Sequence, residues 1–221
     1  AHLSEPRLRE TAITGADPLN SLPGTDGRNI HLPGSVSLFE NAQDNFGFYK
    51  VSLMHQLGYF EFGCFDHIQW VEKMLAEHDD KLLAERIFLI VEDARIDWQL
   101  STRFEGLAPQ LNRQKAHALE SQILRGVTRR SKLLVAMLAT GLDFKLAQAD
   151  SEADDLWQEK RQLEILMLDL RPAGATLEDS IRATRVCYQI INASTAAAQN
   201  RRAELSELDG QISAAELPPP I

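Results

Sequence analysis

Apolar residues recur every three or four positions along most of the chain after about residue 41, which is the spacing of one face of an α-helix. The first such run carries Phe46, Tyr49, Leu53 and Leu57, and Gly63 follows it where a glycine commonly ends a helix. The same periodicity predicts further helices over residues 68–77, 80–104, 109–124, 128–140, 156–170, 177–191 and 194–217.

Polar residues and glycines at the ends of these runs predict where several helices begin and end. Asp80 places negative charge at a helix start, where the helix dipole is positive. Ser151-x-x-Asp154 and Thr176-x-x-Asp179 each resemble a capping box at the start of a helix. We expect Gly141 to close the helix before it and Gly210 to interrupt the last helix.

The two ends of the chain have a different character. Residues 1–36 are rich in Gly, Pro, Asn, Asp and Ser, and residues 28–33 are expected to form one extended segment at most. The expected organisation is a loop-rich segment over 1–36, a helical domain over 37–217, and a proline-rich linker over 218–221 toward a missing domain. The sequence therefore predicts an all-α, irregular domain of about seven helices.

Charge and composition narrow the classes of function. The 221 residues include 23 Lys and Arg against 32 Asp and Glu, giving a net charge of −9. Such an acidic chain is a poor candidate for binding nucleic acid or an anionic membrane. No apolar run approaches the ~18–20 residues of a membrane-spanning helix. Cys64 and Cys187 have no disulfide or zinc-knuckle spacing, so we expect a reducing, cytoplasmic setting.

Several catalytic and nucleotide-binding motifs are missing from the sequence. It contains no Walker A loop, no G-x-G-x-x-G and no G-x-S-x-G, which removes the common nucleotide-binding and hydrolase interpretations. It also contains no H-E-x-x-H and no paired E-x-x-H motifs of the kind that hold two iron ions in helical bundles. A catalytic or metal-binding site in this chain would therefore have to be built from residues outside these common motifs.

One such arrangement joins two predicted helices. His55 and Tyr59 lie four residues apart and share a face of the first helix, whereas Glu61 lies nearer its opposite side. The second helix carries Glu-Asp-Ala-Arg-Ile-Asp over residues 92–97, which puts three carboxylates and a guanidinium into an otherwise apolar run. Ionised groups in such a place are costly unless they are paired.

Two interpretations of this arrangement remain open. The first is a structural polar cluster that fixes two helices in register. Its members would be Lys50, His55, Glu61, Glu92, Asp93, Arg95 and Asp97. The second is a transition-metal site whose candidate ligands are His55, Glu61, Glu92 and Asp93. Tyr59 stands where a second metal-binding histidine would be most useful.

These segments resemble a known family. The matching residues are Leu32-Pro33, Tyr49-Lys50, His55-Gln56-x-Gly58-x-x-Glu61-Phe62-Gly63, Ala84-Glu85-Arg86-Ile87-Phe88-x-x-x-Glu92-Asp93-Ala94-Arg95-Ile96-Asp97, Arg103-Phe104-Glu105-Gly106-Leu107, and Glu178-Asp179-Ser180 with Tyr188. Over roughly residues 28–192 the chain is similar to the region preceding the von Willebrand factor A domain in the nitric-oxide-reductase-activation and Rubisco-activase-adaptor family. The helix carrying residues 92–97 is the most specific part of the resemblance.

The resemblance implies a non-enzymatic adaptor without a cofactor. Its partners would be a hexameric MoxR-type AAA+ ATPase, which consumes the nucleotide, and a client such as Rubisco or a reductase. The alternative is a metal-binding or degenerate metalloprotease-like helical domain centred on the four candidate ligands. A third, weaker alternative is a stand-alone ligand-binding bundle, which would need a large buried pocket.

Overall fold

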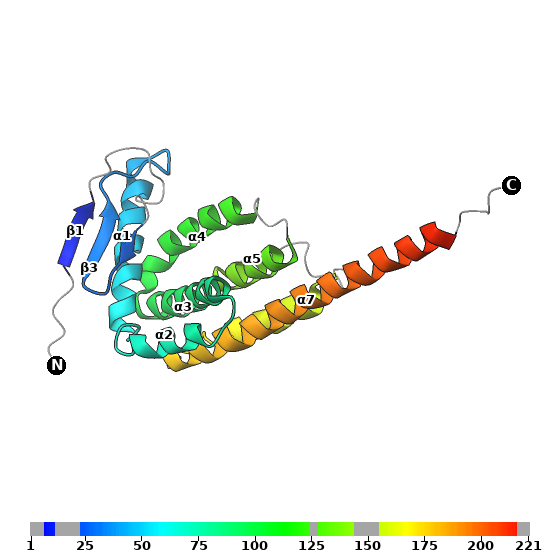
Figure 1. The fold of residues 1–221 in the computed structure, drawn as a ribbon. Coiled ribbons are helices and arrows are strands. Elements are labelled where there is room, and N and C mark those ends of the chain that lie inside the picture. The colour runs from blue at the N-terminus through cyan, green and yellow to red at the C-terminus, as the bar shows by residue number, and fades with distance from the viewer. Residues whose placement is uncertain (1–6, 12–22, 124–127, 144–154, 216–221) are drawn as a thin grey trace.

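The computed structural model describes residues 7–11, 23–123, 128–143 and 155–215 (Figure 1). Within these ranges it contains seven α-helices and one small sheet, which confirms the predicted all-α domain of about seven helices. The helices are α1 (Ala42–Glu61), α2 (Ile68–Ala76), α3 (Lys81–Arg103), α4 (Ala108–Ile123), α5 (Arg129–Gly141), α6 (Trp157–Leu168) and α7 (Leu177–Ala215). The expected linker over 218–221 lies outside the described residues.

The small sheet corrects the expectation of one extended segment at most. Three strands, β1 (Arg7–Thr11), β2 (Gly24–Thr25) and β3 (Asn29–Pro33), pair with β3 in the centre. The pairing of β1 with β3 is parallel and that of β2 with β3 is antiparallel. Strands of two to five residues are too short to display an alternating pattern, and a parallel pair leaves no hairpin signature in the sequence.

Two of the predicted helix starts carry the expected caps. The carboxylate of Asp80 accepts a hydrogen bond from the backbone N–H of Leu83 at 3.0 Å, and α3 begins at Lys81, directly after Asp80. The backbone N–H of Thr176 donates to the carboxylate of Asp179 at 2.8 Å, which is half of a capping box at the start of α7. The other predicted box, at residues 151–154, lies outside the described residues.

Two glycines behave differently from the prediction. Gly210 does not interrupt the last helix, because α7 runs unbroken from Leu177 to Ala215, and residues 177–191 and 194–217 do not form separate helices. A single glycine costs a helix only about 1 kcal/mol, which the alanines upstream offset. Gly141 is a packing residue: a Cβ there would lie 2.9 Å from the Cβ of Ala94. The left-handed residue that follows α5 is Asp143, with φ 58°.

The central helix α3 contributes to three hydrophobic clusters among the described residues. In Figure 1 it lies in the middle of the helical body, and it packs against α1, α2, α5 and α7. The larger core joins α3 to α5, α6 and α7, and includes Ile87, Val91, Leu133, Leu163 and Ile191. A second core joins α3 to α1 and the start of α4, and includes Val51, Ile96, Leu100, Leu107 and Leu111. A third joins α3, through Phe88, to α2 and the start of α7. Residues in the middle of α3 are therefore enclosed on most sides.

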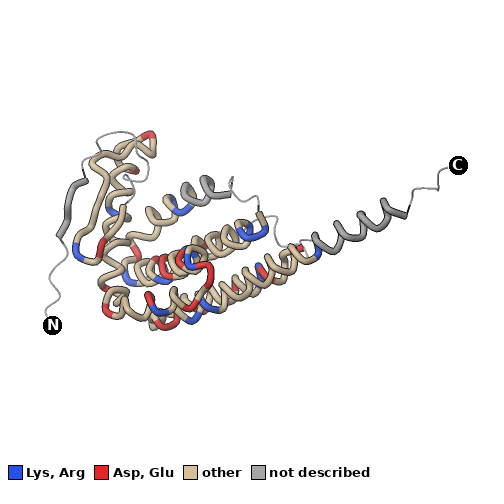
Figure 2. Tube along the Cα trace, in the orientation of Figure 1, with Lys and Arg blue, Asp and Glu red and all other residues tan. Residues whose placement is uncertain are grey.

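Charged residues of both signs occur along the described helices. Figure 2 shows acidic and basic positions interspersed on the described helices, including α3. None of the helices in the described part of the chain combines the length and apolar character needed to cross a bilayer.

Candidate functional site

The charged residues of α3 divide into two clusters on different sides of the helix. Successive residues are about 100° apart around a helix, so Asp93 and Asp97 share one side while Glu92 and Arg95 share another. We call the first set, with its partners on α1 and α4, the His55 cluster: His55, Tyr59, Asp93, Asp97 and Lys115. We call the second the Arg95 hub: Cys64, Glu92, Arg95 and the carbonyls of Phe62 and Ala175.

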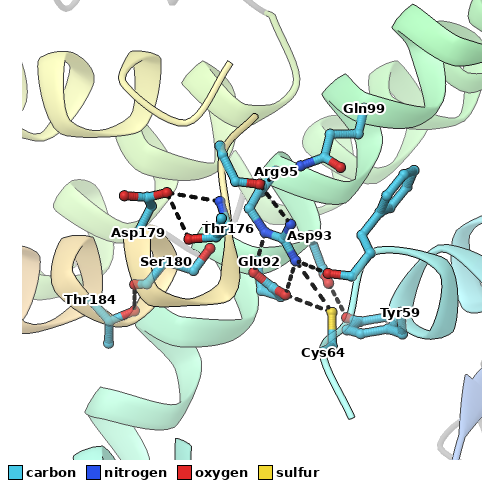
Figure 3. Close-up of polar contacts among 12 residues, drawn as sticks. Tyr59, Cys64, Glu92, Asp93, Arg95, Gln99, Thr176, Asp179, Ser180 and Thr184 are labelled. Atoms are coloured by element: carbon cyan, nitrogen blue, oxygen red, sulfur yellow. Dashed lines mark hydrogen bonds and ion pairs between the residues drawn. The ribbon is translucent and has the colours of Figure 1, made fainter. Parts of the chain in front are cut away.

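The Arg95 hub is a fully buried ion pair. The side chains of Glu92 and Arg95 are 0% and 1% exposed. Arg95 donates to both carboxylate oxygens of Glu92, from Nε at 2.9 Å and from one terminal nitrogen at 2.6 Å (Figure 3). The thiol of Cys64 donates to the same carboxylate at 2.6 Å. This bidentate geometry is the strongest form of carboxylate recognition by arginine.

The remaining donors of Arg95 hold two loops. One guanidinium nitrogen donates to the carbonyl of Phe62, just after α1, at 3.2 Å. The other donates to the carbonyl of Ala175, just before α7, at 3.1 Å, and Gln99 donates to the same carbonyl at 2.7 Å. The hub therefore fastens the end of α1 and the start of α7 to the middle of α3.

The electrostatics of the hub favour a charged Arg95 and an inert thiol. Burial by itself would lower the pKa of Arg95, but the hydrogen bonds and charge of Glu92 outweigh burial and raise it. Burial, together with the nearby charge of Glu92, raises the pKa of the Cys64 thiol. Because the thiolate is the reactive form, Cys64 is protected from nucleophilic chemistry.

The His55 cluster joins α1 to α3 and α4 by a row of charges. His55 Nδ1 lies 2.8 Å from Asp97 Oδ1, and its Nε2 lies 3.4 Å from Asp93 Oδ1. The Tyr59 hydroxyl donates to that same oxygen of Asp93. On the far side, Lys115 Nζ lies 3.3 Å from Asp97 Oδ2. Four of the five members are largely enclosed, and Asp93 is the exposed one, at 46%.

A glycine permits the close approach that this cluster needs. Gly58 lies between His55 and Tyr59 in α1, and a Cβ at this position would lie 2.5 Å from Ile96 Cγ2 on α3. Any larger residue would therefore push the two helices apart. The contact brings α1 near enough for His55 to reach both aspartates.

The two aspartates set the charge state of His55. Burial by itself lowers the pKa of this imidazole, but the negative charges of Asp97 and Asp93 outweigh burial and raise the pKa from 6.5 to about 10. Burial likewise opposes the ionised form of Asp97, and the neighbouring His55 and Lys115 reverse this and lower its pKa. At neutral pH the cluster therefore holds a protonated histidine between two carboxylates.

The structure separates residues that the sequence grouped together. Lys50 is exposed, and Glu61 forms an exposed ion pair with Arg103. The expectation that Lys50 and Glu61 join the polar cluster is therefore wrong, because they lie about 140° and 240° around α1 from His55. Glu92 belongs to the Arg95 hub instead of the His55 cluster.

This separation also bears on the metal interpretation. The four candidate ligands, His55, Glu61, Glu92 and Asp93, lie in three different places, and only His55 and Asp93 meet. Among the described residues no group of three or more His, Cys, Asp and Glu side chains is placed to hold a metal ion.

Two members of these clusters were not identified from the sequence. Cys64 follows Gly63, whose φ of 75° turns the chain back toward α3. Lys115 lies one helical turn after the buried Leu111 on α4 and is itself only 4% exposed. The helical spacing that places Lys115 on the same side of α4 as Leu111 could have indicated a buried lysine. A buried lysine in turn indicates an acidic partner, since lysine is almost never fully buried without one.

Comparison with known protein families, with curated proteins and with solved structures finds no match to this chain. The functional argument therefore rests on the residues themselves and on the geometry of the two clusters.

Proposed function

We propose that this chain is a non-enzymatic adaptor that couples a MoxR-type AAA+ ATPase to a client protein of the Rubisco or nitric oxide reductase kind. The observation that carries the proposal is the use of the segment at residues 92–97, the most specific part of the resemblance. Glu92, Arg95 and Asp97 all bond to other parts of the chain and are buried. Such a motif supports rigidity in preference to chemistry.

Rigidity is what a force-transmitting adaptor requires. When an ATPase pulls or twists one part of such a domain, work reaches the client only if the domain does not deform. The Arg95 hub fastens the ends of α1 and α7 to α3, and the His55 cluster adds α4. Helix α7, with 39 residues, extends beyond the other helices (Figure 1) and gives the rigid body a long arm.

The outer side of α3 offers a surface for the ATPase. Leu82 and Leu89 lie seven residues apart, which is two helical turns, and are 74% and 45% exposed. Glu85 and Arg86 lie between them and are also exposed. Apolar side chains framed by charges are typical of a contact surface between proteins that also exist apart.

Size-exclusion chromatography of the chain with the MoxR-type hexamer of the same organism, with and without ATP, tests the proposal. We expect co-elution and an altered rate of ATP hydrolysis. The double variant Leu82→Glu and Leu89→Glu is expected to weaken the complex at least 10-fold. Ile165→Glu, which places the same charge at an exposed apolar position on α6, is the matched control and should bind as the wild type does.

The outcome against the proposal is equally plain. Separate elution under both nucleotide conditions, with an unchanged rate of ATP hydrolysis, would refute an adaptor role for this domain. Where a complex forms, adding Rubisco or nitric oxide reductase in separate runs identifies which client joins it.

A further inference from the structure

We propose that the outer side of α3 binds the same side of a second copy of this chain, in a parallel pair related by a two-fold axis. The surface consists of Leu82, Glu85, Arg86 and Leu89, all of which are exposed. Such a pair would hide this surface from the ATPase. That regulatory consequence rests on the function proposed above, whereas the pairing itself depends only on the arrangement of the four residues.

The first support is an exposed apolar line along α3. Leu82 and Leu89 are 74% and 45% exposed, although Leu83 and Phe88, their neighbours in the sequence, are buried. Seven residues make almost two helical turns, so the two leucines lie only about 20° apart around the helix. Exposed apolar residues that lie in a line on one element, instead of singly, mark an interaction surface.

The second support is the position of one charge on each side of this line. Glu85 and Arg86 are adjacent and therefore about 100° apart around α3, so each lies about 50° from the line of the leucines, on opposite sides. Among the described residues neither charge has an ion-pair partner, whereas the nearby Asp80 is paired with Arg130. Both charges are therefore available to a second molecule.

The third support is that this surface is complementary to itself. A two-fold axis along α3 brings each leucine opposite its own copy and exchanges the two sides of the line. Glu85 then faces Arg86 of the second copy, and Arg86 faces Glu85 of the second copy. Such isologous contacts, in which residue i meets j and j meets i, are the usual form of a homodimer interface. An antiparallel pair would instead place Glu85 against Glu85 and Arg86 against Arg86, which is unfavourable.

Helix α1 determines how closely the two copies can approach. It covers the same side of α3 further along, where Gly58 lies against Ile96. The two α3 helices would therefore be closest at Leu82, the more exposed leucine, and would diverge toward α1. Four residues on each copy are far fewer than the about 20–30 of a standard interface, so we expect a weak and reversible dimer.

Sedimentation equilibrium of the chain alone, from micromolar to millimolar concentrations, tests the pairing. We expect a monomer–dimer equilibrium, which the double variant Leu82→Glu and Leu89→Glu weakens at least 10-fold. Ile165→Glu adds the same kind of charge at an exposed apolar position on α6 and should leave the equilibrium unchanged. A monomer throughout this range, or a dimer that the leucine variant leaves unaltered, would overturn the proposal.

Charge reversal tests the pairing of Glu85 with Arg86 without relying on the leucines. Glu85→Arg and Arg86→Glu each place like charges opposite one another on both sides of the axis, so each variant alone should dimerise at least 10-fold more weakly. An equimolar mixture of the two variants should regain the dimer, because every facing pair then joins opposite charges. Single variants as strong as the wild type, or a mixture that stays monomeric, would contradict the parallel arrangement.

Cross-linking with a short bismaleimide distinguishes the parallel from the antiparallel pair. Cys64 and Cys187 are both buried, so an introduced surface cysteine is the accessible thiol. Leu82→Cys should cross-link to its own copy at least 10-fold faster than Ile165→Cys. In an antiparallel pair position 82 lies opposite position 89, so equal rates for the two variants would overturn the proposal. These measurements use the chain alone, so their failure is separate from a failure to bind the ATPase.

Discussion

The protonated His55 makes the stability of the fold depend on pH in a way that can be calculated. Its pKa is about 10 in the folded chain and 6.5 in the absence of the cluster. Between these values the folded state holds a proton that the unfolded state has released. The free energy of unfolding therefore falls as the pH rises, since stability falls wherever the native state binds more protons than the unfolded state.

The size of the effect follows from the two pKa values. Below pH 6.5 the contribution of His55 is fully developed, and it is lost as the pH rises through about 10. At about 1.4 kcal/mol for each tenfold difference in proton affinity, His55 contributes about 5 kcal/mol at pH 6 and about 3 kcal/mol at pH 8. We therefore expect a loss of about 2 kcal/mol between these two pH values from this one side chain.

Urea unfolding followed by circular dichroism at pH 6 and pH 8 measures this loss. The variant His55→Gln lacks the titrating group, and the other histidines are common to both proteins and cancel in the comparison. The wild type should lose about 2 kcal/mol more than His55→Gln. Asp93→Asn removes one of the two carboxylates and should give an intermediate slope. Equal pH dependence in the wild type and His55→Gln would refute the charge state assigned to the cluster.

Three further substitutions test the packing and the hub by urea unfolding. Arg95→Ala leaves Glu92 buried without its partner and should cost about 3–5 kcal/mol, and a loss below 1 kcal/mol would contradict the buried pair. Gly58→Ala forces α1 away from α3 and should lower the free energy of unfolding by about 1–3 kcal/mol. Its control is Gly47→Ala in the same helix, where the added Cβ would lie 3.6 Å from Gln110 Cγ, so this change should be neutral or stabilising. Asp80→Ala removes the cap of α3 and should cost about 1 kcal/mol, and an unchanged midpoint would count against the cap.

Local features of the sequence predicted much of the helical fold. The start of α3 was predictable because Asp80 and the apolar spacing after it depend only on neighbouring residues. The sheet was not, because the pairing of β1 with β3 depends on residues far apart in the chain. The continuity of α7 through Gly210 was missed because a glycine weakens a helix without ending it.

The site was predictable in composition but not in arrangement. The charged run on α3 identified Glu92, Arg95 and Asp97 as paired residues, since ions in an apolar helix need partners. Which partner each one meets depends on how α1 and α4 pack against α3. Lys115 and the Ala175 carbonyl come from segments that no spacing rule connects to that run.

The contact between Arg95 and Ala175 spans 80 positions of the chain, and this has a consequence for synthesis. At about 5–20 residues per second, a ribosome adds those residues in roughly 4–16 s, which is far longer than helix formation or hydrophobic collapse takes. Until residue 175 has been added, the guanidinium of Arg95 lacks one of the two carbonyl acceptors that it has in the folded chain. The hub can therefore close fully only after the start of α7 has been made, so the last of its bonds forms late in the synthesis of the chain.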